Sequence, residues 1–315
     1  ANTAFKLSGN TEITSSDNMT FGTLDLGGNR LTLGTGSAGL TLPNTLTMDN
    51  ASSAIETKNV NLTLGKALSL TAGSITSTGG TLSFSGGLTL GAAGALDVSG
   101  STLSVSQNLD LSAGTFSSDN SSMLDLQAVT MLSSDDQVTG QAPVTFEDVH
   151  FNGNGLALGS ASTHLKVNDA LTLDGYTTSL ATGAGSLTLS GALALSNNAS
   201  LNSSGGTITL QSGGSASTAS EVSLTDTTLV TNNYFTFTGS TLAAINTTFT
   251  TNGFGLAIDS GSILEVEGTQ NISGLFADNT STLRLTADTE LNNNAWFNVN
   301  TLDLADFALT LDDNM

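Results

Sequence analysis

Carboxylates are the most abundant ionisable side chains of this 315-residue chain, with 27 Asp and Glu against six Lys and Arg. Acidic pairs in polar stretches could bind Ca²⁺, which takes six to eight oxygen ligands. The candidate calcium ligands are Asp135, Asp136, Asp312 and Asp313. Neither an EF-hand loop nor the calcium-binding nonapeptide of β-rolls is present. We therefore expect no cofactor. For these four residues the alternatives are a calcium site and surface carboxylates that contact only solvent.

The histidines and basic residues are too scattered to indicate a catalytic site. His150 and His164 lie 14 residues apart, which does not match the repeat described below. Glycoside hydrolysis needs two carboxylates in a groove, and a polysaccharide lyase needs a base with an Arg or Lys near the developing anion. The two arginines, Arg30 and Arg284, are far apart in the chain. The sequence predicts no catalytic or cofactor-binding residues and no enzyme, with a polysaccharide-degrading enzyme as an alternative.

The elements that position these side chains are repeats of about 20 residues. They are clearest in NLTLGKALSLTAGSITSTGG (61–80), TLSFSGGLTLGAAGALDVSGS (81–101) and TLSVSQNLDLSAGTFSSDNSS (102–122). Their apolar residues align in columns: Leu62, Leu82 and Leu103 in one, Leu68, Leu88 and Leu109 in another. An apolar-x-apolar triplet places both apolar side chains on one face of a short strand. The Gly, Ser, Asn and Asp residues that follow turn the chain.

One circuit of such strands cannot bury its own apolar face, whereas stacked circuits bury a continuous ladder. The sequence therefore predicts an all-β fold, a single-stranded parallel β-helix (β-solenoid) with about 20 to 22 residues per coil. About 15 coils stacked roughly 4.8 Å apart would give a rod about 70 Å long.

The repeat predicts one continuous β-helix over residues 1–315. Residues 1–23 are expected to form an irregular start or a cap. Residues 132–142 and 211–221 are expected to be loop insertions, the usual tolerated change in repeat proteins. No C-terminal cap is recognisable, so we expect either a longer protein or a contact between the ends of two copies.

Threonine and asparagine recur at positions that point away from the expected core. Thr-x-Thr pairs occur at Thr45/Thr47, Thr207/Thr209, Thr236/Thr238 and Thr248/Thr250. An array of such pairs could bind ice or another crystalline surface. We expect no array, because the pairs do not fall on consecutive coils at one phase, and β-propensity explains outward Thr. Asn runs at 197–198, 232–233 and 292–294 are expected at turns, in left-handed conformations or in side-chain ladders.

The composition argues against several classes of partner. A net charge of −21 disfavours nucleic acid and anionic membrane surfaces, both of which need a basic patch. No apolar run of about 18 residues is present, so we expect no membrane insertion of this segment. The absence of Cys excludes disulfides and thiolate sites. Richness in Ser, Thr, Asn and Gly favours an extracellular protein.

The coil length, the LTL and LSL triplets with Gly, Ser or Asn turns, and the acidic, Cys-free composition resemble the β-helical regions of bacterial surface proteins. These are the autotransporter passenger domains and the filamentous-haemagglutinin-type adhesins. The resemblance covers roughly residues 24–311. It rests on repeat pattern and composition and not on a signature motif, so it carries over no functional residue. It implies a right-handed coil at the cell surface or outside the cell.

These observations predict a non-enzymatic extracellular protein of a bacterial cell surface with a structural or adhesive role. Its expected partners are other copies of itself, or glycans and proteins of a host or another surface. The alternative is a self-assembling subunit of an extracellular filament, sheath or surface layer, joined through its ends or its faces.

Overall fold

The structure, a computed structural model, is an all-β solenoid of parallel strands with about 13 turns, as the repeat predicts. It describes residues 4–119, 121–134, 144–159, 161, 163–252, 255–272, 275–292, 296–297 and 299–311, and these contain no helix. The turns are somewhat fewer than predicted, and the coil from Leu124 to its register partner Val149 spans 25 residues. Contacts divide the chain into two compact units, Ala1–Leu156 and Ala157–Met315.

The first unit stacks short parallel strands in three groups. One is a seven-stranded sheet of β3 (Asn18–Thr20), β6 (Gly39–Leu42), β9 (Asn61–Leu64), β11 (Thr81–Phe84), β13 (Thr102–Val105), β16 (Met123–Leu126) and β19 (Asp148–His150). The second holds β2 (Thr11–Ile13), β5 (Arg30–Leu33), β8 (Ala54–Lys58), the later parts of β10 (Leu68–Ser77) and β12 (Leu88–Asp97), and β15 (Thr115–Ser117). The remaining strands are β1 (Ala4–Lys6), β4 (Thr23–Asp25), β7 (Leu46–Thr47), β14 (Leu109–Leu111), β17 (Thr130–Ser134) and β18 (Val144–Phe146).

The second unit has three faces, and β20 (Gly155–Leu158) lies at the boundary. The β24 face holds β21 (His164–Val167), β24 (Ser186–Leu189), β27 (Thr207–Leu210), β30 (Thr228–Thr231), β33 (Thr248–Thr251) and β40 (Leu309–Leu311). The β25 face holds β22 (Leu171–Asp174), β25 (Leu193–Ser196), β28 (Gly214–Ser217), β31 (Phe235–Thr238), β34 (Leu256–Asp259), β36 (Leu275–Ala277) and β38 (Trp296–Phe297). The β26 face holds β23 (Ser179–Gly183), β26 (Ser200–Ser204), β29 (Glu221–Thr225), β32 (Thr241–Ile245) and β39 (Thr301–Asp303). The long strands β35 (Ile263–Ile272) and β37 (Thr282–Asn292) each run through a corner and contribute to the β26 and β24 faces.

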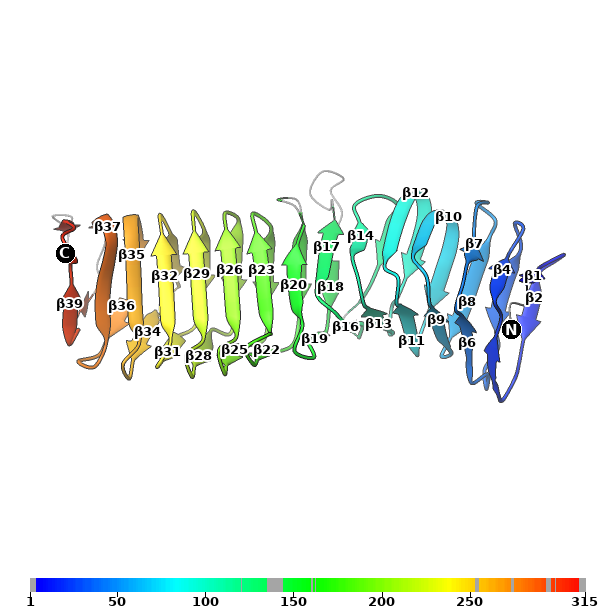
Figure 1. The fold of residues 1–315 in the computed structure, drawn as a ribbon, viewed down its shortest axis with the longest axis horizontal. Coiled ribbons are helices and arrows are strands. Elements are labelled where there is room, and N and C mark those ends of the chain that lie inside the picture. The colour runs from blue at the N-terminus through cyan, green and yellow to red at the C-terminus, as the bar shows by residue number, and fades with distance from the viewer. Residues whose placement is uncertain are drawn as a thin grey trace. The chain divides into compact units, whose positions relative to one another are not determined.

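The predicted apolar columns are confirmed as the core. Leu62, Leu82, Leu103 and Leu124 pair in register across β9, β11, β13 and β16, and each is fully buried. The same arrangement recurs in the second unit, where Figure 1 shows β23, β26, β29 and β32 side by side. Each leucine therefore packs on the equivalent residue of the coil before and after it, which is the ladder that a solenoid needs.

The predicted loop at residues 211–221 is wrong. Residues 214–217 form β28, which pairs in register with β25 and β31. The strand lacks an apolar-x-apolar pair because Gly214 and Ala216 occupy its two inward positions. A Cβ on Gly214 would lie 2.3 Å from the carbonyl oxygen of Leu193, so no larger residue fits there. The bulky Phe235 and Phe237 of β31, both fully buried, follow at the same positions of the next coil.

Residues 4–23, expected as an irregular start or a cap, form strands that pair in register with the next coil. Phe5, Thr11 and Met19 pair in register with Leu24, Leu31 and Leu40 of the next coil. Parallel pairing uses backbone groups, so these strands form although their triplets are less apolar. Of the predicted loop at 132–142, Leu132 to Ser134 belong to β17, and the later residues lie outside the described ranges.

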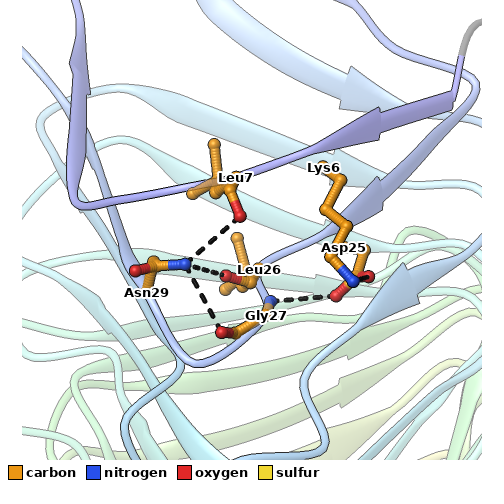
Figure 2. A network of polar contacts seen from close by, with 6 residues as sticks. All are labelled: Lys6, Leu7, Asp25, Leu26, Gly27 and Asn29. Atoms are coloured by element: carbon orange, nitrogen blue, oxygen red, sulfur yellow. Dashed lines mark hydrogen bonds and ion pairs between the residues drawn. The ribbon is translucent and has the colours of Figure 1, made fainter.

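Corners are held by side chains that bond both their own turn and the preceding coil. In Figure 2, Asn29 Nδ2 donates to the carbonyl oxygens of Leu26 at 2.9 Å and of Leu7, on the previous coil, at 3.2 Å. The Asp25 carboxylate accepts the Gly27 N–H at 2.9 Å and pairs with Lys6 at 3.0 Å. Such bonds fix where each coil turns.

The structural role predicted for the asparagine runs is confirmed where they are described. Asn197 and Asn198 have φ of 54° and 65°, in the left-handed region that Asn tolerates. Asn252 Nδ2 donates to Asn232 Oδ1 of the preceding coil at 2.5 Å. Both predicted uses of asparagine, turn and ladder, are therefore present.

Candidate interaction surfaces

The four candidate calcium ligands, Asp135, Asp136, Asp312 and Asp313, lie outside the described residues, so calcium there stays a prediction. Across the described ranges, no group of three or more His, Asp or Glu side chains could hold a metal ion.

Two corner aspartates show what the described carboxylates do. Asp278 accepts the Thr280 hydroxyl at 2.6 Å, the Ser281 hydroxyl at 2.7 Å and the Thr280 N–H at 2.9 Å. These bonds hold the pKa of Asp278 well below its usual range. Asp119 accepts the hydroxyl and the N–H of Ser121, at 2.8 and 2.9 Å, which lowers the pKa of Asp119 to about 2. Both carboxylates stabilise corners.

The histidines and arginines are placed on outward positions of separate strands. His150 Nε2 lies 2.9 Å from Asp148 Oδ2, and His164 Nε2 lies 3.3 Å from Thr188 Oγ1. The arginines join carboxylates of other coils: Arg30 contacts Glu56 at 3.3 Å, and Arg284 contacts Glu265 at 2.8 Å and Asp303 at 3.4 Å. Both arginines therefore form ion pairs that link neighbouring coils.

The β25 face carries an exposed pair of aromatic rings, here called the aromatic platform: Tyr234 and Phe276. Tyr234 immediately precedes β31 and is 47% exposed, and Phe276 in β36 is 46% exposed. Their ring centroids lie 6.2 Å apart at 59°. The register partner of Phe276 in β38 is Trp296, the only tryptophan of the chain. Three of the few aromatic residues thus come from nearby strands of one face.

The β24 face carries a regular hydroxyl array, here called the threonine face. Its outward residues are Ser186 and Thr188 of β24, Thr207 and Thr209 of β27, Thr228 and Val230 of β30, and Thr248 and Thr250 of β33. As expected, the Thr-x-Thr pairs do not fall on consecutive coils at one phase, but two of them share a face two coils apart. Thr207/Thr209 and Thr248/Thr250 lie on the same face, with Thr228/Val230 in register between them.

The threonine face is not recognisable from literal Thr-x-Thr pairs. A search for literal Thr-x-Thr pairs misses Ser186/Thr188 and Thr228/Val230, although each pair flanks an inward Leu187 or Leu229 as the others flank Ile208 and Phe249. Aligning outward residues on these buried ones is the signal that would have found the face.

Comparison with protein families, with curated proteins and with solved structures gives no match to this chain. In the described part of the chain, no helix is long and apolar enough to cross a membrane.

Proposed function

We propose that this chain is a non-enzymatic, extracellular protein of a bacterial surface that adheres to glycans through a lateral face of its β-solenoid. The parallel β-solenoid is compatible with this role. The richness of the chain in Ser, Thr, Asn and Gly supports an extracellular setting. The resemblance to autotransporter passenger domains and filamentous-haemagglutinin-type adhesins supports the adhesive role.

The observation that carries the adhesive role is the aromatic platform. Aromatic rings combine a large apolar face with low conformational freedom, which suits them to recognition surfaces. The C–H groups on the face of a sugar ring pack well on such rings. Tyr234 and Phe276 are about half exposed although their neighbours Phe235 and Phe237 are fully buried.

A glycan array tests this proposal. We expect the chain to bind a subset of glycans, and Tyr234→Ala and Phe276→Ala to weaken that binding by about tenfold each, as for central aromatic contacts. Tyr176→Ala is the matched control, because Tyr176 is 84% exposed in the same unit but lies outside the platform. Equal losses in all three variants, or no glycan bound by the unmodified chain, would contradict the proposal.

A self-assembling subunit is the second candidate, favoured by apolar residues near the end of the described chain. Leu302 pairs in register with the buried Leu283 yet is 49% exposed, and Leu304 and Phe307 are 39% and 38% exposed. A further coil or a second copy would cover them.

Electron microscopy and light scattering, with and without millimolar Ca²⁺, separate these candidates. Filaments or sheets that disappear in Leu302→Asp support assembly through these residues. Assembly that appears only with Ca²⁺ would implicate carboxylates such as Asp312 and Asp313. Isolated particles under both conditions leave the adhesive role. Release of reducing ends or unsaturated products from a polysaccharide panel would support the enzymatic alternative instead.

A further inference from the structure

The threonine face is regular in two directions. Its four strands pair in register without a bulge: Thr188 with Thr209, Thr209 with Val230, and Val230 with Thr250. Strands in a sheet lie roughly 4.8 Å apart, and alternate residues of one strand lie roughly 6.7 Å apart. The eight outward side chains therefore form a two-column mesh of fixed spacing across four coils.

The hydroxyl groups of this mesh are available to a ligand. In the described part of the chain, none of the hydroxyls of Thr207, Thr209, Thr228, Thr248 and Thr250 bonds to another protein group, whereas Thr188 contacts His164. Buried hydroxyls elsewhere behave differently: Thr227 bonds Ser203 at 2.9 Å and Thr247 bonds the Leu224 carbonyl oxygen at 3.1 Å. The outward threonines are thus not part of the ladders that hold the coils together.

The four strands of the threonine face carry no charged outward residue, although the preceding strand, β21, places His164 and Lys166 in register with Ser186 and Thr188. None of the eight outward residues is ionisable in a chain with 27 Asp and Glu. The residues that follow the four strands, Ser190, Gln211, Asn232 and Asn252, are also uncharged, and Asp226 lies in the corner before β30. On the β26 face, by contrast, the corresponding outward column includes Glu265, Arg284 and Asp303.

We propose that the threonine face of the second unit binds the surface of an ice crystal. Oxygen rows in crystal planes of ice repeat on the same scale as the mesh, so water held by successive threonines can join the lattice. The γ-methyl groups limit competing water orientations, and hydroxyls bond water nearly as well as they bond protein. Charged side chains would orient water around themselves and disturb the ice lattice. Uncharged outward residues on these four strands therefore suit ice binding.

Ice partitioning tests the proposal directly. The full chain is frozen slowly into a growing ice hemisphere, and its share in the ice is compared with that of an acidic protein of similar size. Thermal hysteresis and crystal faceting are measured in parallel. We expect the chain to be enriched in ice and Thr209→Lys to reduce that enrichment by about tenfold or more, because a lysine blocks close approach of the lattice. Thr228→Lys is expected to act in the same way.

Thr236→Lys is the matched control, since Thr236 is an outward threonine of β31, on the adjacent face of the same coil. It should leave ice binding unchanged, with thermal unfolding by circular dichroism confirming that all variants fold. An unmodified chain that neither enters ice nor facets crystals overturns the proposal, whatever the variants do. Equal losses in Thr209→Lys and Thr236→Lys overturn it as well. Glycan binding by Thr209→Lys should persist, so the two proposals fail separately.

Discussion

Asp278 links two coils through one carboxylate. Besides its own corner donors, it accepts the N–H of Ser260 on the previous coil at 3.2 Å. Its pKa is lowered from 3.8, chiefly by the Thr280 hydroxyl, so its ionised form stabilises the fold at pH above that value. This contribution is lost as pH falls below 3.8 towards the folded pKa. Asp119 plays a similar part, because it accepts the N–H of Gly100 on the previous coil at 3.0 Å besides its own corner donors.

We predict that Asp278→Asn lowers the melting temperature at neutral pH and that its difference from the unmodified chain shrinks between about pH 4 and pH 2. Calorimetry across this pH range measures both effects. Burial, and then Asp278 itself, raise the pKa of Asp259, so Asp259→Asn is measured alongside to separate the two groups. Asp226→Asn serves as a corner control. A difference in melting temperature between Asp278→Asn and the unmodified chain that stays constant down to pH 2 would contradict this role of the Asp278 carboxylate.

At the scale of strands, β28 shows that a coil can lack the apolar pair and still be regular. Gly214 and Ala216 leave space that Phe235 and Phe237 of β31 fill, with ring centroids 4.7 Å apart. We predict that Phe237→Ala costs about 3–5 kcal/mol of unfolding free energy, because neighbours as small as Ala216 cannot close the cavity. Urea denaturation measures the loss. Tyr176→Ala should change the free energy by no more than about 0.5 kcal/mol, and a similar loss in both variants would argue against the packing.

The strand triplets explain how much the sequence could predict. Period-two pairs such as Leu62 and Leu64 are local signals, so the parallel β-solenoid and its core columns follow from them. The strand at 214–217 and the threonine face depend on what lies one coil away, and that register is not local. A segment with Gly214 at an inward position is predicted to be a loop, because the sequence alone does not show that Phe235 is its register partner. Handedness of the coil and the ligands of the outer faces stay predictions.

For the molecule as a whole, stability is a sum of contacts between adjacent coils. We predict that Leu103→Ala, which costs about 2–5 kcal/mol at a fully buried position, lowers hydrogen-exchange protection most in β11, β13 and β16. Strands of the second unit should keep their protection. Exchange measured by mass spectrometry resolves these segments, and Ser83→Ala on the outward side of β11 is the control. A uniform loss across both units would mean that the chain unfolds as a single cooperative block.

The pairing of β28 with β31 also limits how far the coils are interchangeable. Removing residues 207–227 would delete one whole turn and bring β24 next to β30 with every inward and outward position kept. The same deletion would press Leu193 and Leu195 of β25 directly against Phe235 and Phe237, which now stack on a glycine and an alanine. A solenoid of this kind can therefore gain or lose a turn only where the inward side chains of the turns brought together have compatible sizes.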